Sequence, residues 1–452
     1  MPTRRTFTKT AAGTVAALSA AGYSRALGAG DRIRVGFIGV GNRGDQVLDG
    51  FLPHKDCEVV ALCDVYEPYL PAANKKAGGS AKLLKDYREL LALKDVDAVV
   101  IATPDHWHAL QFVDACRAGK DVYVEKPVSL TVGEGRVMCR VAEETNRVTQ
   151  VGFHRRSTPF VREAVEAIRG GAIGKVTVAQ SFFHRNETPM GIGPATPTEP
   201  QAGLDWDLWL GPAPKVPYAD NKVLYKFRWF PNYSGGQITN MGAHYLDVIQ
   251  WALGQDAPKA VACLGGKYAV EDGREIPDTM QAVWEYDGCL ATFSQFNANG
   301  APGNVKNWSM MFRGDKGTLY LSDGTAGYEI VPESVRTEPL PALSPIAREE
   351  NRRQGRAVKP ARKPQVVKGQ GDATTLHARN FLDSVKSRKP THCPVETGHR
   401  STSAALIANI ALKTHALLDW DTQTEKFTNN QQANALLRYD YRQPYTFPEV
   451  KG

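Results

Sequence analysis

Short apolar runs, many of them rich in β-branched residues, alternate with helical stretches over the first third of the chain. Runs of this kind between turn residues are typical of strands buried on both faces of a sheet. Strands that alternate with helices predict a parallel, doubly wound α/β sheet. The predicted strands cover residues 33–38, 57–62, 96–102, 121–124 and 148–153, and the predicted helices begin at residue 45, end before Gly119 and span 130–146.

The pattern changes after residue 154, where apolar and polar residues alternate along several segments. Alternation with a period of two predicts strands at 175–183, 280–286 and 290–296 and near 313–320, with Asp287-Gly288 as a hairpin turn. Helices are predicted at 160–169, 235–253, 373–388 and 396–418. A basic, Pro-rich loop at 345–370 precedes the last two helices, which we expect to pack back on the first half.

Composition limits the class of protein. The chain has 452 residues, of which 42% are hydrophobic and 23% charged, enough for two globular domains with their own cores. Residues 348–368 and the first thirty residues together carry more positive charge than the net +7 of the whole chain, so the rest of the chain is slightly acidic and no nucleic-acid partner is expected. Seven scattered cysteines without a Cys-x-x-Cys pair argue against a disulfide scaffold or a zinc site.

A glycine-rich turn, Gly39-Val40-Gly41-Asn42-Arg43-Gly44, closes the first predicted strand and opens the first helix. Glycines there allow a sharp turn and close approach of a pyrophosphate, which the helix N-terminus binds through free N–H groups. Asp64 follows the second strand, 25 residues after Gly39, where a carboxylate can accept from a ribose 2′-hydroxyl. No arginine follows Asp64 directly, so the pattern favours NAD over NADP. The alternative is an ordinary βαβ turn with a solvated Asp64.

Two further motifs end predicted strands at the same edge of the sheet, where ligands bind in doubly wound folds. Glu125-Lys126-Pro127 follows the strand at 121–124, and Thr103-Pro104-Asp105-His106-Trp107-His108 follows the strand at 96–102. His108 fits a helix start beside a cofactor. The alternatives are a metal site at His106 and His108, which no further ligand cluster accompanies, and a surface lysine at position 126.

At these residues the chain resembles the Gfo/Idh/MocA family of sugar and inositol oxidoreductases, over about residues 31–440. The resemblance implies an NAD-binding Rossmann domain at 31–154 and an α+β domain at 155–452, whose open, largely antiparallel sheet forms the floor of a substrate pocket. It also implies a homo-oligomer, a dimer or a tetramer, and a small carbohydrate substrate.

The resemblance assigns roles to the Glu-Lys-Pro motif. Lys126 orients the substrate hydroxyl and relays its proton, and Glu125 lies near the nicotinamide ribose. This is sensible chemistry, because hydride loss from a carbinol carbon requires removal of the hydroxyl proton, and a lysine among apolar walls can have a lowered pKa. No metal ligands are expected. The predicted cofactor contacts are Gly39, Gly41, Asn42, Arg43, Gly44, Asp64, Thr103, Pro104, His108, Glu125 and Lys126.

The second half supplies Asn240 and His244, which lie four residues apart and share a face of the predicted helix. Polyol dehydrogenases of the family usually carry an aspartate where Asn240 stands, paired with the histidine as an acid/base couple. Asn240 can bind a hydroxyl but cannot raise the basicity of His244, which alternatively only caps and packs. His154 and Tyr225 are further candidates for the substrate pocket.

Aromatic segments at 204–212 and 227–230 offer flat apolar faces with a few polar edges, which suit a pyranose ring. The same residues could equally anchor the core and the loops. The sequence alone gives these two interpretations equal weight.

The first thirty residues resemble a twin-arginine export signal, with Arg4-Arg5 before a weakly apolar stretch at 10–22. An amphipathic tail is the alternative. No run approaches eighteen apolar residues, so we expect a soluble periplasmic or secreted protein without a transmembrane anchor. Because this route moves folded proteins, the cofactor should travel bound and be regenerated in the same site.

The sequence therefore predicts an exported NAD-dependent oxidoreductase that acts on a sugar, polyol or glycoside with a tightly bound cofactor. One alternative is a glycoside hydrolase in which NAD transiently oxidises a ring hydroxyl, so that the leaving group is eliminated before water adds and the ketone is reduced. Another is a sugar-binding protein that has lost turnover.

Overall fold

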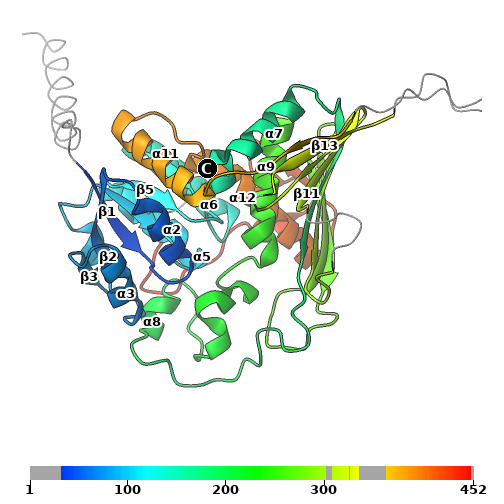
Figure 1. Ribbon diagram of the computed structural model, residues 1–452. Helices are drawn as coiled ribbons and strands as arrows, with labels where there is room; N and C mark the ends of the chain where they lie inside the picture. Colours follow the sequence, from blue (N-terminus) through cyan, green and yellow to red (C-terminus); the bar gives the residue numbers. More distant parts are fainter. Residues whose placement is uncertain (1–31, 302–307, 325, 335–362, 449–452) are drawn as a thin grey trace, which may run out of the picture.

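Two sheets organise the chain in the computed structural model, which describes residues 32–301, 308–324, 326–334 and 363–448 (Figure 1). The predicted export signal lies outside the described residues, as does most of the loop predicted at 345–370. The last part of that loop is not irregular, because Gln365–Val367 pairs with the edge of the second sheet. Within the described residues, no helix has the length and apolar content needed to cross a membrane.

The first sheet contains six parallel strands, confirming the predicted Rossmann topology. Its strands follow the order β3-β2-β1-β4-β5-β6. The strands are β1 Ile33–Ile38, β2 Cys57–Cys63, β3 Lys82–Leu84, β4 Ala98–Ile101, β5 Asp121–Val124 and β6 Thr149–Val151, and the helices that follow them are α2 Arg43–Phe51, α3 Tyr69–Lys76, α4 Tyr87–Leu91, α5 Asp105–Arg117 and α6 Val132–Thr145.

Successive residues of β4 face opposite sides of this sheet, which explains why this strand is apolar throughout. Val99 and Ile101 belong to the core cluster under α4, α5 and α6, whereas Ala98 and Val100 belong to the cluster under α2 and α3. All four side chains are fully buried. The sheet is therefore covered on both faces, and its carboxyl edge stays free for a ligand.

The second sheet has ten strands in the order β14-β13-β12-β11-β7-β10-β9-β8-β15-β16. Only β7 and β10 pair in parallel, so the sheet is largely antiparallel, as predicted. The strands are β7 Val176–His184, β8 Ala260–Gly266, β9 Thr279–Tyr286, β10 Cys289–Phe296, β11 Met310–Gly314, β12 Gly317–Leu321, β13 Tyr328–Pro332, β14 Gln365–Val367, β15 Leu418–Asp421 and β16 Lys426–Phe427.

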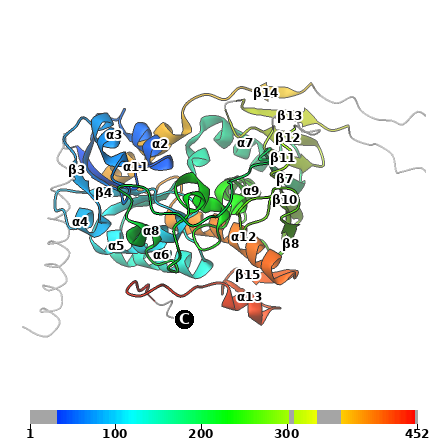
Figure 2. The ribbon, with the colours of Figure 1, turned by 90° about the horizontal axis from the view of Figure 1, so that it is seen from below.

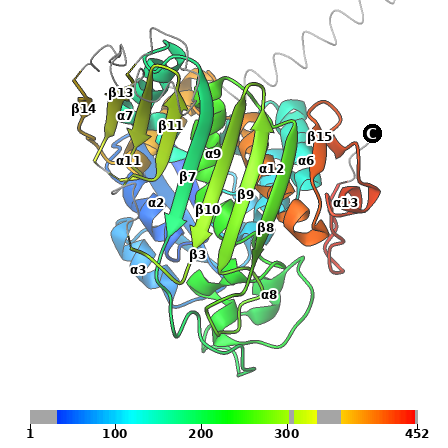
Figure 3. The same ribbon diagram turned by 90° about the vertical axis from the view of Figure 1, so that its right-hand side faces the viewer.

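Helices cover one face of the second sheet, and Figure 3 views it from the opposite face. Trp284 on β9 is fully buried and its indole N–H donates to the carbonyl of Ala404, which links the sheet to the helix α12, Val395–Thr414. The remaining helical segments are η1 His154–Ser157, α7 Pro159–Arg169, α8 Trp206–Leu210, η2 Asp220–Lys222, η3 Leu224–Trp229, η4 Ile238–Gly242, α9 Ala243–Leu253, α11 Ala373–Ser387, α12 Val395–Thr414 and α13 Gln431–Ala435.

Helices α11 and α12 lie against the first domain, α11 beside α2 and α12 beside α6 (Figure 2). Phe381 of α11 packs edge-on against Phe51 and Tyr123, at ring distances of 6.2 and 5.9 Å. Late segments of the chain thus complete a core that begins at its first strand.

Two predicted helices have different limits in the structure. The helix predicted at 396–418 ends at Thr414, because His415 takes a left-handed conformation with φ of 50° and Leu418 begins β15. The helix predicted at 235–253 is not a regular α-helix throughout. Its first part is a π turn, η4, and α9 starts only at Ala243, so Asn240 and His244 lie in different helical segments.

Candidate active site

A pocket opens at the carboxyl edge of the six-stranded sheet, and the space within it, including the open solvent at its mouth, is about 1180 Å³. Among the predicted cofactor contacts, Gly39, Gly41, Asn42, Arg43, Asp64, Thr103, Pro104, His108, Glu125 and Lys126 line the pocket. Gly44 lies beneath this wall, where a Cβ atom would come within 2.1 Å of the Gly39 carbonyl oxygen.

The glycine-rich turn has the geometry that a pyrophosphate site requires. Gly39 has a φ of 84°, and Gly44 lets α2 pack directly on the turn. Asn42 precedes α2 without a side-chain hydrogen bond to its first turn, which leaves this helix end free to bind an anion. The residues present therefore fit a dinucleotide phosphate group.

Asp64 lies at the end of β2 and faces the same pocket. Its Oδ2 accepts from the Val40 N–H at 2.9 Å and its Oδ1 from the Tyr66 N–H at 2.9 Å. Burial raises the pKa of Asp64 to about 6, against these backbone hydrogen bonds. The Gly41 and Val65 N–H groups also act on this carboxylate, so backbone groups of the turn and of the segment after β2 surround Asp64.

Two cations near Asp64 were missed in the sequence, because they follow β3, which was not predicted. Lys85 pairs with Glu67 and Asp205, and Arg88 pairs with Asp86. Both cations line the pocket, but carboxylates already neutralise them. This end of the pocket therefore suits an unphosphorylated ribose better than a ribose 2′-phosphate.

Lys126 lies in the pocket wall and reaches the second domain. Its Nζ donates to Oδ1 of Asn240 at 2.8 Å and to the Asn240 carbonyl at 3.1 Å. Burial lowers the pKa of Lys126 to about 7, against the carboxylate of Glu125. Near neutral pH about half of the amine is then unprotonated and able to accept a proton.

Glu125 is 3% exposed and forms an ion pair with Arg43 at 3.0 Å. Burial alone would raise the pKa of Glu125, but Arg43 and Lys126 outweigh it and hold this pKa below its usual value. The pair connects the glycine-rich turn to the Glu-Lys-Pro motif. Two motifs 82 residues apart in sequence thus form one site.

His108 occupies a fixed position behind Lys126. Its Nδ1 is 2.7 Å from the Pro127 carbonyl oxygen and its Nε2 is 2.8 Å from that of Thr103. The ring therefore joins the ends of β4 and β5. This role supports the pocket wall. Among the described residues, no group of three or more His, Cys, Asp or Glu side chains is placed to hold a metal ion.

The two other predicted histidines lie together, behind the wall. The rings of His154 and His244 are 5.0 Å apart, and Arg43 approaches Nδ1 of His154 at 3.3 Å. Burial lowers the pKa of both histidines well below its usual value, so both rings are neutral. Nδ1 of His244 is buried without a hydrogen bond, and the described residues show none between His244 and Asn240.

The aromatic segments serve both of the purposes that the sequence left open. Trp209 and Phe227 line the pocket. Trp229 and Phe230 do not line it, but they are buried in one hydrophobic cluster with Trp209 and Phe227. Tyr225 is 38% exposed and lies outside the pocket wall. Its role in substrate binding stays a prediction, as do the roles of the other site residues.

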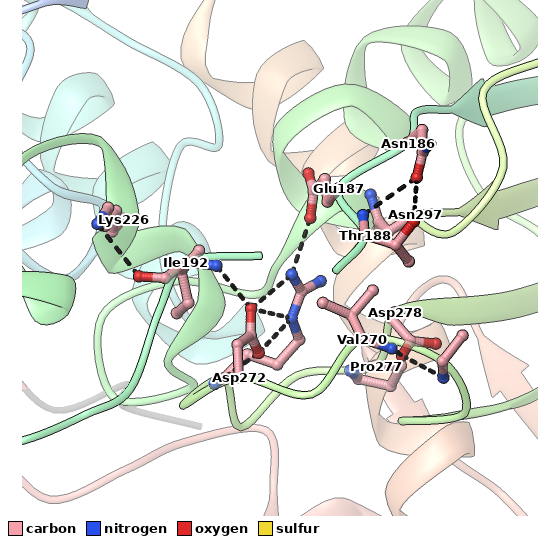
Figure 4. A network of polar contacts seen from close by, with 12 residues as sticks. Asn186, Glu187, Thr188, Ile192, Lys226, Val270, Asp272, Pro277, Asp278 and Asn297 are labelled. Carbon is pink, nitrogen blue, oxygen red and sulfur yellow. Dashed lines mark hydrogen bonds and ion pairs between the residues drawn. The ribbon is translucent and has the colours of Figure 1, made fainter. Parts of the chain in front are cut away.

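A polar network fixes the segment η3, which carries Phe227 and Arg228 (Figure 4). Arg274 is 1% exposed and donates to Asp272, whose Oδ2 also accepts from the Ile192 N–H at 2.7 Å. Lys226 in turn donates to the Ile192 carbonyl at 3.1 Å. No motif in the sequence indicated this network, because its members come from separate loops.

Two segments of the second domain close over the pocket. The first, residues 203–211, is here called the cover segment. Its Leu204 forms an isolated antiparallel β-bridge with Tyr66, and the Asp205 N–H donates to the Val65 carbonyl at 3.0 Å. Leu204, Leu208 and Trp209 of this segment line the pocket.

The second, residues 438–447, is here called the C-terminal strap. Its Arg442 donates to the Gly211 carbonyl at 2.9 Å and to Asp207 at 2.8 Å, so it fastens the cover segment. Tyr445 packs edge-on against Trp107 and also lines the pocket. A ligand in the pocket would thus contact segments more than 400 residues apart.

Comparisons with known proteins agree with this arrangement. Residues 33–153 match the Gfo/Idh/MocA family model described as "Oxidoreductase family, NAD-binding Rossmann fold", and residues 165–293 and 364–447 match the model of its "C-terminal alpha/beta domain". Together the two matches cover well over half of the chain.

Among curated relatives, an alpha-N-acetylgalactosaminidase of Shewanella oneidensis is 37% identical over 123 residues, which is 25% of this chain and 27% of the relative. A glycosyl hydrolase family 109 protein of another Shewanella strain matches equally well. The match thus spans about a quarter of the length of these relatives. Among solved structures, scyllo-inositol dehydrogenase of Lactobacillus casei superposes with a TM-score of 0.59 at 21% identity, covering 86% of this chain and 99% of that one.

Proposed function

Because the chain belongs to the Gfo/Idh/MocA oxidoreductase family, with an NAD-binding Rossmann domain, we propose that it transfers hydride between NAD and a hydroxyl-bearing carbon of a sugar, polyol or glycoside. The single observation that carries the proposal is the environment of Lys126. Its half-buried side chain lies in the pocket wall, and the amine is hydrogen-bonded to Asn240, with a pKa lowered to about 7.

The residues of this chain divide the work of the reaction. Gly41, Asn42 and Arg43 would hold the dinucleotide phosphates, and Asp64 would hold a ribose. When bound, NAD supplies the hydride acceptor. The neutral amine of Lys126 accepts the proton of the substrate hydroxyl as the hydride leaves the carbon that bears this hydroxyl. Asn240 orients the amine through two hydrogen bonds. Reduction runs the same proton transfer in reverse.

The structure also supports a tightly bound cofactor. The cover segment and the C-terminal strap both line the pocket, so a bound dinucleotide would contact both, and Arg442 joins the two through its bonds to Gly211 and Asp207. Slow exchange favours a reaction in which the same bound cofactor is oxidised and reduced in turn. It also agrees with the proposed export of a folded, loaded enzyme through the twin-arginine route.

A second candidate function is glycoside hydrolysis by transient oxidation, and the match to family 109 glycosyl hydrolases favours it. Oxidation of a ring hydroxyl acidifies the neighbouring C–H bond, so the leaving group can be eliminated. Water then adds, and reduction of the ketone restores the hydroxyl. Lys126 would move the hydroxyl proton in the first and last steps of this sequence, and the substrate would undergo no net redox change.

Denaturing the purified protein and analysing the released small molecules by mass spectrometry tests the cofactor, and a panel of sugars, polyols and aryl glycosides tests the reaction. A keto sugar would support the first function, and release of the aglycone without net oxidation would support the second. Replacing Lys126 by alanine should slow either reaction by about 100- to 10,000-fold. Lys75→Ala, a change at an exposed lysine, is the control.

If the protein binds no dinucleotide and exchanges hydride with no carbohydrate, the proposal fails. If the inactive wild type and the Lys126→Ala variant then bind carbohydrate equally well, the protein is a binding protein and not an enzyme.

A further inference from the structure

The buried carboxylate of Asp105 lies in the pocket wall and has no role in the proposed proton and hydride transfer. Asp105 begins α5 directly after β4 and is 6% exposed. Its Oδ2 accepts from the Ser234 hydroxyl at 2.5 Å, which fixes the orientation of the carboxylate. Among the described residues, no hydrogen-bond donor contacts its other oxygen, and Asp105 lines the same pocket as Lys126.

A guanidinium lies in the same pocket, without a carboxylate at ion-pair distance in the described part of the chain. Arg228 of η3 stacks over the rings of Tyr225 and Phe227, at 4.5 and 4.7 Å from their centroids. One of its N–H groups donates to the Tyr225 carbonyl at 3.0 Å. A guanidinium carries five N–H donors, so most of them remain for a ligand.

The two side chains have complementary chemistry. Asp105 offers an oriented acceptor, Arg228 offers donors in a plane, and Trp209 and Phe227 supply apolar faces in the same wall. One acceptor and one donor beside an aromatic face match two neighbouring hydroxyls and the C–H face of a sugar ring. The carboxylate of Asp105 and the guanidinium of Arg228 balance each other in charge, so the pair matches an uncharged ring better than an ionised one.

We propose that Asp105 and Arg228 form a subsite for two neighbouring hydroxyls of an uncharged sugar ring, and that this subsite holds the ring while Lys126 takes the proton of the reacting hydroxyl. The inference rests on the proposed function, which it deepens by naming the substrate class. It also explains how the site can orient a sugar although position 240 carries no carboxylate.

The network of Figure 4 supports this role, because Lys226, two residues before Arg228, attaches η3 to the Ile192 carbonyl. Ser234 holds the carboxylate of Asp105, and its side chain is 1% exposed. Both partners of the subsite are thus fixed before a substrate arrives, which reduces the entropic cost of binding.

The test measures kcat/KM of Asp105→Asn, Arg228→Gln and wild type on the sugar identified by the panel and on its deoxy analogues, each lacking one hydroxyl. Asp105→Asn keeps the shape and the contact to Ser234 but loses the charge. We expect a loss of about 10- to 100-fold in kcat/KM for each variant on the parent sugar. In wild type, kcat/KM for one deoxy analogue should fall by a similar factor. In Asp105→Asn the same analogue should lose almost nothing further, because the contact between Asp105 and that hydroxyl is already gone.

Three comparisons make the result decisive. Asp95→Asn, at an exposed position of the same domain, should leave kcat/KM unchanged. The dinucleotide content of both subsite variants should equal that of wild type, whereas a parallel loss would assign these residues to the cofactor and overturn the subsite. Equal losses from the deoxy analogue in wild type and variant would also overturn it. An inactive wild type would instead refute the proposed function on which the subsite depends.

Discussion

Replacing Asn240 by aspartate tests the central role given to Lys126. The substitution keeps the shape of a side chain whose Oδ1 lies 2.8 Å from Nζ of Lys126 and adds a charge. It also replaces the amide that donates to Gln237 by an oxygen, which a flip of the Gln237 amide can accommodate. In the native site, burial lowers the pKa of Lys126 to about 7 and the hydrogen-bond acceptor at position 240 is neutral. A carboxylate at this position stabilises the protonated amine, so the pKa of Lys126 rises.

The magnitude follows from the distance. Two unit charges 2.8 Å apart attract by about 6 kcal/mol at an effective dielectric constant of about 20, which equals about four pKa units. Desolvation of the new carboxylate removes part of this gain, so we expect a rise of about 1 to 3 units. The unprotonated fraction of Lys126 at pH 7 then falls from about one half to between about a tenth and a thousandth.

The assay is the rate of a single turnover, followed by nicotinamide absorbance between about pH 5 and pH 10. In wild type the rate should rise with pH and level off above about pH 7, where Lys126 has lost its proton. In Asn240→Asp the same limb should move to higher pH, with a rate about 5- to 500-fold lower at pH 7 and recovery in alkali. Asn240→Ser removes the side-chain amide without adding charge and is the control, whose limb should not move upward.

Two results would refute this reasoning. A limb that stays at the same pH in Asn240→Asp would show that Lys126 is not the group that titrates. A faster reaction at pH 7 would show that the carboxylate itself takes the proton, so that the native site lacks its best base.

Three further predictions concern the glycine-rich turn, the strap and the interface between helices. Gly44→Ala should destabilise the protein by about 1–3 kcal/mol and lower its dinucleotide content, because the new Cβ would lie 2.1 Å from a backbone oxygen; urea unfolding and mass spectrometry measure the two effects. Arg442→Ala should release bound dinucleotide at least about tenfold faster, measured by dilution into a trap, because the strap loses its charged hydrogen bonds to Asp207; an unchanged rate would contradict the strap's role. Arg136→Met should lower the free energy of unfolding at pH 7 by about 1–2 kcal/mol, because Arg136 binds Glu396 of α12 and Glu425. Burial raises the pKa of Glu396, but Arg136 outweighs it and brings the pKa to about 2. The stability gained from this ion pair is therefore present above pH 4.5 and is lost as the pH falls toward 2. Urea unfolding at both ends of that range should show the difference in unfolding free energy between wild type and Arg136→Met shrinking in acid.

Most of the first domain and its binding edge follow from the sequence. The predicted strands there are short, mostly apolar runs, each motif follows its strand directly, and a parallel sheet brings such strand ends to one edge. The glycine-rich turn, Asp64 and Glu125-Lys126 could therefore be placed from short-range patterns alone. The three-residue strand β3 offers no such apolar run and was not predicted. The same patterns fixed neither the end of α12 nor the start of α9, because a left-handed residue and a π turn carry no distinct sequence signal.

The packing of the folded chain brings in the distant residues that complete the site. Arg228, Tyr445 and Ser234, the donor to Asp105, come from segments that the sequence separates by 100 residues or more from the strands they face. Their positions depend on how the second sheet, the cover segment and the C-terminal strap pack against the first domain, and packing leaves no periodic trace along the chain. For the same reason the hydrogen bond from Lys126 to Asn240, which spans 114 residues, could not be read from the spacing of Asn240 and His244.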